Sequence, residues 1–351
     1  MIPPGETIGI LGGGQLGRMM AMAAANLGYH VHIYAPEENS VAAEVSAAFT
    51  CAPWDDEAAM RAFAGACAVV TYEFENVPAG PLAAIAPTPL LAHPRALETA
   101  QDRVSEKTFV RGLGGATAPF AIVDSRADLL AAIDSLGTPG ILKTRRDGYD
   151  GKGQWRIMTP AEAEGLDLPE AALIYEGFVQ FFAEFSVILA RGADGAIRFW
   201  DSAENVHEDG ILALSTAPAS AAVQAQVPAA RALAQDIAQS LDYVGVLAVE
   251  FFATAQGPVF NEMACRVHNS GHWTTEGAIT SQFENHIRAI CGLPLGDTGL
   301  AARGVEMRNI IGDDARGWAT ILSDPANHLH LYGKAQSRMG RKMGHVTRLI
   351  L

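Results

Sequence analysis

Hydrophobic runs separated by polar turns divide the start of the chain into alternating strands and helices. Residues 7–11 form an unbroken apolar run typical of a buried strand, and a stretch rich in Met and Ala over 18–27 has helical character. Residues 31–34 and 68–72 predict further strands, with a helix at about 57–63 between them. This alternation indicates a small, doubly wound parallel sheet, whose ligands bind at the carboxyl ends of its strands.

Proline-rich breaks at 87–89 and 93–94 end this pattern. A helix containing Gln101, Asp102, Arg103 and Lys107 is expected next, followed by a small α+β lobe over about 117–182. Strands are predicted near 141–143, 154–157, 172–175, 184–190 and 197–200, and a long Ala- and Gln-rich helix over about 220–241. From about residue 300 the pattern is short and β-like. The predicted domains are therefore 1–98, 99–299 and 300–351.

Two apolar, strand-like runs, 249–252 and 259–263, each carry a carboxylate and are joined by a Gly-Pro turn. If the runs pair antiparallel, Glu250 and Glu262 can lie close together on neighbouring strands. Two facing carboxylates repel unless a cation lies between them, and Mg²⁺ prefers one or two carboxylates together with substrate phosphates. The alternative is a surface hairpin with two solvated acids.

Composition narrows the class of protein. The chain has 351 residues, 49% of them hydrophobic, and a net charge of −14, which argues against general nucleic-acid binding. No apolar run reaches the roughly 20 residues that span a bilayer, and residues 1–6 lack the features of a signal peptide. The 4 cysteines are scattered and suggest neither disulfides nor a zinc site, which fits a reducing cytoplasm.

Against this acidic background, basic clusters at 143–156 and 334–345 suggest sites for small anions, although either could be a solvated loop. The first cluster is the stronger signal, because Lys143 precedes a glycine-bearing loop, 148–154, that can fold its N–H groups over phosphates. An ordinary β-turn is the alternative. Residues 176–179 suggest a hinge whose backbone could bind adenine, with Glu184 at the ribose; by itself this segment could also be a solvated linker. His207 lies in a polar segment and, taken alone, could be a structural histidine.

Gly12, Gly14 and Gly17 match the G-x-G-x-x-G dinucleotide fingerprint between a strand and a helix. The acid that would hold the ribose at the end of the second strand is absent from its usual place, since Glu37 comes slightly late. The glycines could also serve tight helix–strand packing. An NAD-dependent oxidoreductase therefore stays an alternative, but it leaves the phosphate loop and the paired glutamates unexplained.

Taken together, the motifs resemble those of the ATP-grasp ligases, and among them the 5-(carboxyamino)imidazole ribonucleotide synthetases of purine biosynthesis. The resemblance runs from about residue 9 to 345, over blocks at 12–19, 72–77, 101–107, 148–154, 204–207, 261–262, 266–273 and 340–345. It implies an ATP-grasp fold with an N-terminal Rossmann-like (pre-ATP-grasp) domain and a small β-rich C-terminal domain. The 266–272 block is the most specific of these motifs.

The resemblance also implies the roles of individual residues. It places Mg²⁺, with Mn²⁺ as a possible substitute, on Glu250 and Glu262, and catalysis on Asp150, Lys152 and Arg266. The residues expected at ATP are Arg103, Lys143, Gly148, Tyr149, Asp150, Gly151, Lys152, Gly153, Gln154, Glu176, Gly177, Phe178, Val179, Glu184, His207, Asn261 and Glu262. Those expected at the ribonucleotide are Gln15, Leu16, Glu73, Lys152, Arg266, His268, Asn269, Lys334, Arg338 and Arg341.

The implied reaction joins bicarbonate to the amine of 5-aminoimidazole ribonucleotide through carboxyphosphate, with ATP cleaved to ADP. A homodimer in the cytoplasm is implied as well, with no nucleic-acid or membrane partner. The chain departs from the family pattern at Cys265, where proline is usual, so that a thiol beside the site could be reactive, and again at 199–202. A non-catalytic nucleotide sensor, or an ATP-grasp enzyme acting on another substrate, remain as alternatives.

Overall fold

The computed structural model describes residues 1–148 and 151–351, and its N-terminal part is a parallel sheet in the order β3-β2-β1-β4. As the sequence predicts, strands alternate with helices and the glycine loop lies between the first strand and the first helix. That helix already begins at Gln15. The elements are β1 (Thr7–Leu11), α1 (Gln15–Asn26), β2 (His30–Ala35), β3 (Ala48–Cys51), α2 (Glu57–Gly65) and β4 (Val69–Tyr72).

The predicted helix around Gln101 and Asp102 is wrong in one respect, because two helices meet there. They are α3 (Pro94–Ala100) and α4 (Arg103–Gly112). Asp102 has an extended backbone, and its side chain accepts hydrogen bonds from the amides of Val104 and Ser105, so it caps α4 instead of continuing α3. After this break, Arg103 and Lys107 of α4 reach the large sheet, where they contact Glu262 and the carbonyl of Asn261.

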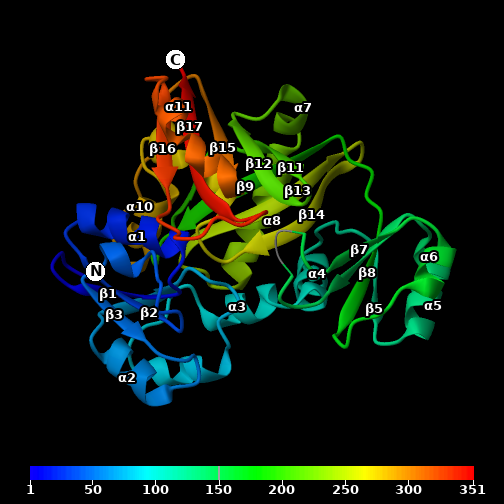
Figure 1. The fold of residues 1–351 in the computed structure, drawn as a ribbon, viewed down its shortest axis with the longest axis horizontal. Helices are drawn as coiled ribbons and strands as arrows, with labels where there is room; N and C mark the ends of the chain where they lie inside the picture. Colours follow the sequence, from blue (N-terminus) through cyan, green and yellow to red (C-terminus); the bar gives the residue numbers. More distant parts are fainter. Residues whose placement is uncertain (149–150) are drawn as a thin grey trace.

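The small lobe is an antiparallel sheet in the order β5-β8-β6-β7, covered by two helices. Figure 1 shows it set to one side of the molecule. Its core, which includes Val123, Leu129, Leu142 and Tyr175, is separate from those of the main body. The elements are β5 (Phe120–Val123), α5 (Arg126–Leu136), β6 (Gly140–Thr144), β7 (Gln154–Ile157), α6 (Pro160–Gly165) and β8 (Leu173–Gly177).

A large antiparallel sheet in the order β14-β13-β9-β11-β12-β15-β17-β16 organises the rest of the described chain, with β10 paired to β9. The long helix predicted over 220–241 is two helices, and Pro228 lies in the first turn of the second. The elements are β9 (Ala183–Arg191), β10 (Ile197–Phe199), β11 (Ala203–Glu208), β12 (Ile211–Ala217), α7 (Ala221–Gln224), α8 (Val227–Ser240), β13 (Gly245–Thr254), β14 (Gly257–Ala264), α9 (Thr274–Gly277) and α10 (Gln282–Ile290).

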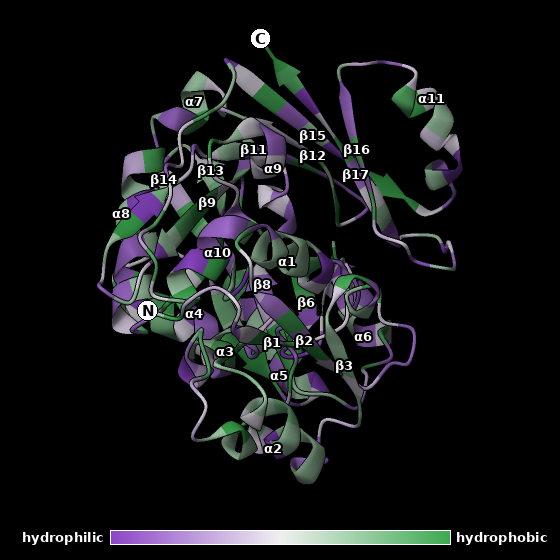
Figure 2. Cartoon of the chain, turned by 90° about the vertical axis from the view of Figure 1, so that its left-hand side faces the viewer, coloured by the Kyte–Doolittle hydropathy of each residue, from purple (hydrophilic) through white to green (hydrophobic). Residues whose placement is uncertain are grey.

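The C-terminal segment continues this sheet. Strand β15 pairs antiparallel with β12, and β17 then lies between β15 and β16. Figure 2 shows these strands at the opposite end of the molecule from α2, with α11 at the outer edge. The elements are β15 (Gly304–Ile311), α11 (Trp318–Leu322), β16 (Asn327–Leu331) and β17 (Lys342–Ile350). No helix in the described part of the chain has the length and apolar character needed to cross a bilayer.

Two cores join the N-terminal sheet to the large sheet. One combines Phe63 with Phe185, Phe251 and Phe260, and the other combines Met20 with residues of α10 and β15. Burial of this apolar surface is the main force holding the segments together. The interface also contains a buried histidine, His286. Its Nδ1 accepts a hydrogen bond from the amide of Val246 (3.1 Å), and its Nε2 lies 2.9 Å from the Thr71 hydroxyl of β4.

Replacing His286 with phenylalanine should lower the free energy of unfolding by about 2–4 kcal/mol, because two buried polar groups lose their partner. Burial lowers the pKa of His286 from 6.5 to about 4. Its contribution to stability is therefore present above pH 6.5 and is lost as the pH falls toward 4. Urea unfolding between pH 4 and pH 8 measures both effects. The matched control is His30→Phe, at an exposed position; equal losses in the two variants would contradict the assignment.

Candidate active site

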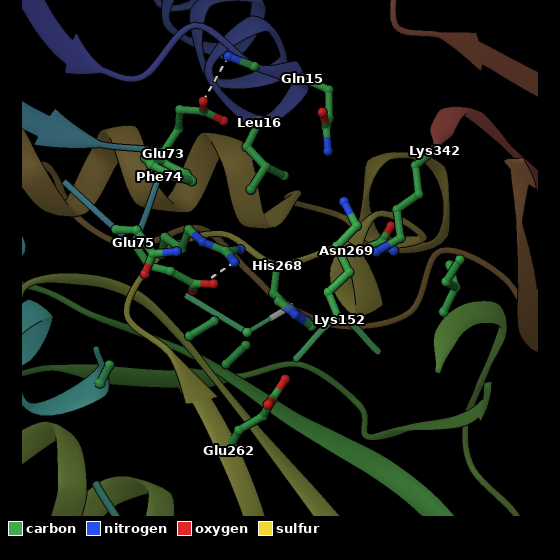
Figure 3. Close-up of a pocket in the computed structure, with 18 of the residues that line it drawn as sticks. Gln15, Leu16, Glu73, Phe74, Glu75, Lys152, Glu262, His268, Asn269 and Lys342 are labelled. Atoms are coloured by element: carbon green, nitrogen blue, oxygen red, sulfur yellow. Dashed lines mark hydrogen bonds and ion pairs between the residues drawn. The ribbon is translucent and has the colours of Figure 1, made fainter. Parts of the chain in front are cut away.

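The N-terminal domain, the large sheet and the C-terminal segment enclose a cavity of about 640 Å³. In Figure 3, Glu73, Phe74 and Glu75 lie along one side of it, and Lys152, Asn269 and Lys342 lie on the other. The structure places every residue predicted at the ribonucleotide in its lining. The predicted lining residues are Gln15, Leu16, Glu73, Lys152, Glu250, Glu262, Arg266, His268, Asn269, Lys334, Arg338 and Arg341, with Arg103 and Gly148 from the ATP set.

Glu250 and Glu262 are direct cross-strand partners in the antiparallel pair β13–β14. The hairpin prediction is therefore confirmed, with a turn tightened to residues 255–256. Burial and the negative charge of Glu262 raise the pKa of Glu250 to about 7. Glu262 opens more to the cavity, and Arg103, whose Nη1 lies 3.2 Å from Glu262 Oε2, keeps the pKa of Glu262 below its usual value against the effect of burial.

This carboxylate pair fits a divalent cation. Glu250 Oε1 is buried and has no hydrogen-bond partner among the described residues; His268 Nδ1 lies 3.8 Å from it, too far for a hydrogen bond. This oxygen is therefore available as a metal ligand. Within the described residues no group of three or more His, Cys, Asp or Glu side chains could hold a metal alone. A two-carboxylate site is what Mg²⁺ uses when substrate phosphates supply further oxygens.

A buried network of cations extends from this pair toward the small lobe. Glu176 lies between Lys143 (Nζ–Oε2, 2.8 Å) and Lys107 (Nζ–Oε1, 3.4 Å), and Lys107 Nζ also donates to the carbonyl of Asn261 (2.9 Å). These charges lower the pKa of Glu176 to about 2, although burial acts to raise it. The predicted ATP residues Lys143, Glu176 and Asn261 are thus connected by contacts. The side chain of Glu176 serves this network, whereas the sequence suggested a hinge role for its backbone.

Other predicted ATP residues lie outside the lining of the cavity. Glu184 and His207, on β9 and β11, form an ion pair (Oε2–Nδ1, 2.7 Å). Burial lowers the pKa of His207, but the hydrogen bond with Glu184 and the charge of Glu250 outweigh it and raise the pKa. The remaining members are Gly151, Gly153, Gln154, Gly177, Phe178 and Val179 on the small lobe and its exit. Tyr149 and Asp150, both predicted at ATP, lie outside the described residues.

The glycine loop does not offer an open anion site. The Glu73 carboxylate accepts hydrogen bonds from the amides of Gly14 (2.7 Å) and Gly17 (3.2 Å), in the position where a dinucleotide fingerprint holds its pyrophosphate. A Cβ on Gly12 or Gly14 would meet Glu73 at 2.6 or 2.8 Å, so the glycines admit the protein's own carboxylate. The NAD alternative loses its binding site for this reason.

Arg266 forms an ion pair with Glu75, and its Nη2 lies 2.7 Å from Glu75 Oε2. The next residues are held rigidly. The side chain of Gln282 accepts from the amide of His268 and donates to its carbonyl, and His268 Nδ1 lies 2.9 Å from the Ser270 hydroxyl. Burial and the charge of Arg266 hold the pKa of His268 well below its usual value, so this ring is neutral.

Two expectations near the site are wrong. The thiol of Cys265 is buried and points to the carbonyl of Ala96 (3.3 Å), and burial raises its pKa, so it is not a reactive group. His345, counted with the C-terminal basic cluster, is buried at 0% exposure, bonds through Nδ1 to the Tyr332 hydroxyl (2.8 Å) and stacks on His330. Lys334, Arg338 and Arg341 of that cluster do line the cavity.

Sequence reasoning missed two acids of the site. Glu106 is 2% exposed, and its Oε1 accepts from the amide of Met263 (2.7 Å), one residue beyond Glu262. Glu75 pairs with Arg266. Both acids lie within sequence blocks that carry the family resemblance, since Glu106 is next to Lys107 and Glu75 lies two residues after Glu73. That position was the one sequence signal that could have pointed to them as site residues. Their partners, 157 residues away for Glu106, become visible only in the fold.

Three family models match successive parts of the chain. They are a ribonucleotide synthetase pre-ATP-grasp domain over residues 5–101, an ATP-grasp domain over 108–283 and a phosphoribosylaminoimidazole carboxylase C-terminal domain over 306–350. The matches agree with the architecture described above: a parallel N-terminal sheet, a small antiparallel lobe beside a large antiparallel sheet, and a β-rich end. The chain is therefore an ATP-grasp protein.

Its relatives define the family more closely. The chain is 50% identical over 354 residues to the N5-carboxyaminoimidazole ribonucleotide synthase of Brucella melitensis, covering 99% of this chain and 97% of the relative. A solved N5-carboxyaminoimidazole ribonucleotide synthetase in complex with ADP matches with a TM-score of 0.94 at 40% identity, covering 100% of this chain and 94% of the other.

A third similar protein is the Aspergillus clavatus N5-carboxyaminoimidazole synthase, solved in complex with ADP and 5-aminoimidazole ribonucleotide. It has a TM-score of 0.89 at 32% identity, and the match covers 98% of this chain and 94% of that one. The chain belongs to the N5-carboxyaminoimidazole ribonucleotide synthase family.

Replacing Glu106 with glutamine should make the protein more stable at alkaline pH. Burial raises the pKa of Glu106 to about 8, only partly offset by Lys107. The stability that the protonated side chain contributes is present below about pH 4.5 and is lost as the pH rises through 8. Glutamine keeps the hydrogen-bond acceptor without the charge. Chemical unfolding should show an advantage on the order of 2 kcal/mol at pH 9 and little at pH 5. Glu98→Gln, at an exposed position of α3, is the control; a pH-independent difference for Glu106→Gln would refute the assignment.

Proposed function

We propose that this protein uses ATP and bicarbonate to carboxylate the amine of 5-aminoimidazole ribonucleotide, giving 5-(carboxyamino)imidazole ribonucleotide, ADP and phosphate in purine biosynthesis. The observation that carries the proposal is the opening of the Glu250–Glu262 pair into the same cavity as Arg266, His268 and Asn269. A site for a metal–triphosphate thereby adjoins a site for anions. Membership of the synthase family supports the same reaction.

Bicarbonate is a poor electrophile, and phosphorylation activates it. One bicarbonate oxygen attacks the γ-phosphorus of ATP, the bond to the β-phosphate oxygen breaks, and carboxyphosphate and ADP form. We propose that Arg103 and Lys143 hold the phosphates and that Arg266 holds bicarbonate, while the buried Lys107 contributes positive charge from behind them. Glu250 and Glu262 would hold Mg²⁺, or Mn²⁺ in its place, which supplies charge neutralisation at the phosphates when bound.

Carboxyphosphate then releases CO₂ and phosphate, and the exocyclic amine of the ribonucleotide attacks the CO₂ carbon and loses a proton. We propose Asp150, which lies outside the described residues, as the base for that proton, with Lys152 of the same loop beside the substrate. Closure of the small lobe would shield carboxyphosphate from water. Lys334, Arg338 and Arg341 line the same cavity and suit the substrate's 5′-phosphate. Gln15 and Leu16, at the start of α1, line it as well.

Phosphate release from ATP, magnesium and bicarbonate tests this function directly. Addition of 5-aminoimidazole ribonucleotide should stimulate release strongly, and the carboxylated product should appear in equal amount. Glycinamide ribonucleotide and biotin serve as matched alternative acceptors for other ATP-grasp carboxylases. Stimulation by one of them alone would overturn the proposal, and an enzyme that binds ATP without turnover would favour the nucleotide-sensor alternative.

The variant Glu262→Gln tests the metal assignment. It keeps the side-chain shape but removes one of the two charges that would hold the cation, and it leaves Arg103 without its ion pair. Metal-dependent ADP formation should fall by about 100-fold or more, while thermal unfolding shows an intact fold. The control is Glu306→Gln, at an exposed position of strand β15 in the same sheet. Unchanged magnesium dependence in Glu262→Gln would remove this residue from the metal site. The homodimer and the cytoplasmic location stay predictions.

A further inference from the structure

The ion pair between Glu75 and Arg266 has no part in the chemistry proposed above. Arg266 is only 14% exposed and Glu75 is 28% exposed, and both line the cavity. Arg266 Nη1 donates to the carbonyl of Val267 (3.0 Å), which fixes one side of the guanidinium, while Nη2 faces the Glu75 carboxylate at 2.7 Å. The Arg266 side chain therefore lines the cavity while its Nη2 is already paired with the Glu75 carboxylate.

A glutamate carboxylate and bicarbonate present the same group to this arginine. Each has a planar O–C–O unit that carries one negative charge, and the guanidinium fork binds that unit by charge-assisted hydrogen bonds. A single guanidinium face that is already paired cannot bind a second anion equally well. Glu75 and a small planar anion are consequently competitors for Arg266.

The backbone around Glu75 is fixed, so that only its side chain is free to leave. Gln101 Nε2 donates to the carbonyls of both Glu75 and Val77, each at 2.8 Å. Two residues earlier, Glu73 is fixed by the amides of the glycine loop. The partly exposed Glu75 side chain can turn toward solvent by rotation of its own bonds, at no cost to these contacts.

We propose that Glu75 is an internal occupant of the bicarbonate subsite, which holds Arg266 in place until bicarbonate displaces it. This inference rests on the proposed function and assigns a positioning residue within it. Occupancy by Glu75 lowers the fraction of molecules whose Arg266 is free to bind the substrate, and so raises the apparent KM for bicarbonate. It also keeps the buried guanidinium paired, which avoids the cost of an isolated charge.

The test is the bicarbonate dependence of ADP formation in Glu75→Gln, at saturating ATP and 5-aminoimidazole ribonucleotide. The neutral amide competes less well for Arg266, so the KM for bicarbonate should fall by about fivefold. The kcat should stay unchanged, so that kcat/KM rises only through the lower KM. An unchanged KM would overturn the proposal. A raised KM with a lower kcat would overturn it too, since it would show that Glu75 is needed to orient Arg266 during turnover.

Two controls separate direct competition from a general loss of negative charge. Glu44→Gln removes an acid paired with Arg18 (2.8 Å) and 54% exposed, outside the lining of the cavity, and should leave the KM unchanged. A direct effect persists in 0.5 M KCl, whereas a long-range effect is screened there; disappearance of the gain at that salt concentration would count against the proposal.

If Glu75→Gln fails to fold, Glu75→Asp keeps the proposal testable. The shorter carboxylate retains the charge but reaches Arg266 less well, so a smaller fall in KM is expected, and an unchanged or raised KM overturns the idea. Failure of the proposed function is a separate result. It would appear as wild-type protein that forms no ADP in response to bicarbonate.

Discussion

The rest of the site depends on two glutamates held opposite each other on adjacent strands. The register of β13 and β14 forces Glu250 and Glu262 together, and burial of Glu250 makes their repulsion costly. The cationic side chains of Arg103, Lys107 and Lys143 surround the pair and offset part of the charge. Lys107 and Lys143 in turn need a buried acid, and Glu176 lies between them. The buried polar network is thus the electrostatic consequence of one strand pairing.

A second constraint comes from the segment that follows β4. Its two glutamates contact different parts of the molecule, because Glu73 binds the start of α1 and Glu75 binds Arg266 beyond β14. The N-terminal sheet is therefore coupled to the anion site through adjacent carboxylates. The glycine loop at 12–17 resembles a dinucleotide site in sequence. In this fold its amides instead bind Glu73, which lines the cavity of the candidate active site.

Much of the fold could be predicted from the sequence, because its strong signals are local. Apolar runs predicted β1, β6, β9 and β13, and the acids of the hairpin were found from alternation and a turn. The breaks at Asp102 and Pro228 were missed, since continuous helical composition outweighed a single cap or proline. Partners of Glu73, Glu75 and Glu106 were beyond sequence reasoning. The contacts of Glu73 with Gly17 and of Glu106 with Met263 span 56 and 157 residues, and Glu75 pairs with Arg266 beyond β14, so all three depend on how whole sheets pack.

The continuation of the large sheet into the C-terminal segment has a further consequence for solubility. Strand β15 pairs with β12 over residues 214–217, and β17 and β16 carry the sheet on to a short terminal strand. An uncovered β12 would present a row of open amides and carbonyls to other chains, the usual route to edge-to-edge aggregation. The same residues that bring Lys334 and Arg341 to the cavity therefore belong to a segment that keeps the main sheet from pairing with its neighbours.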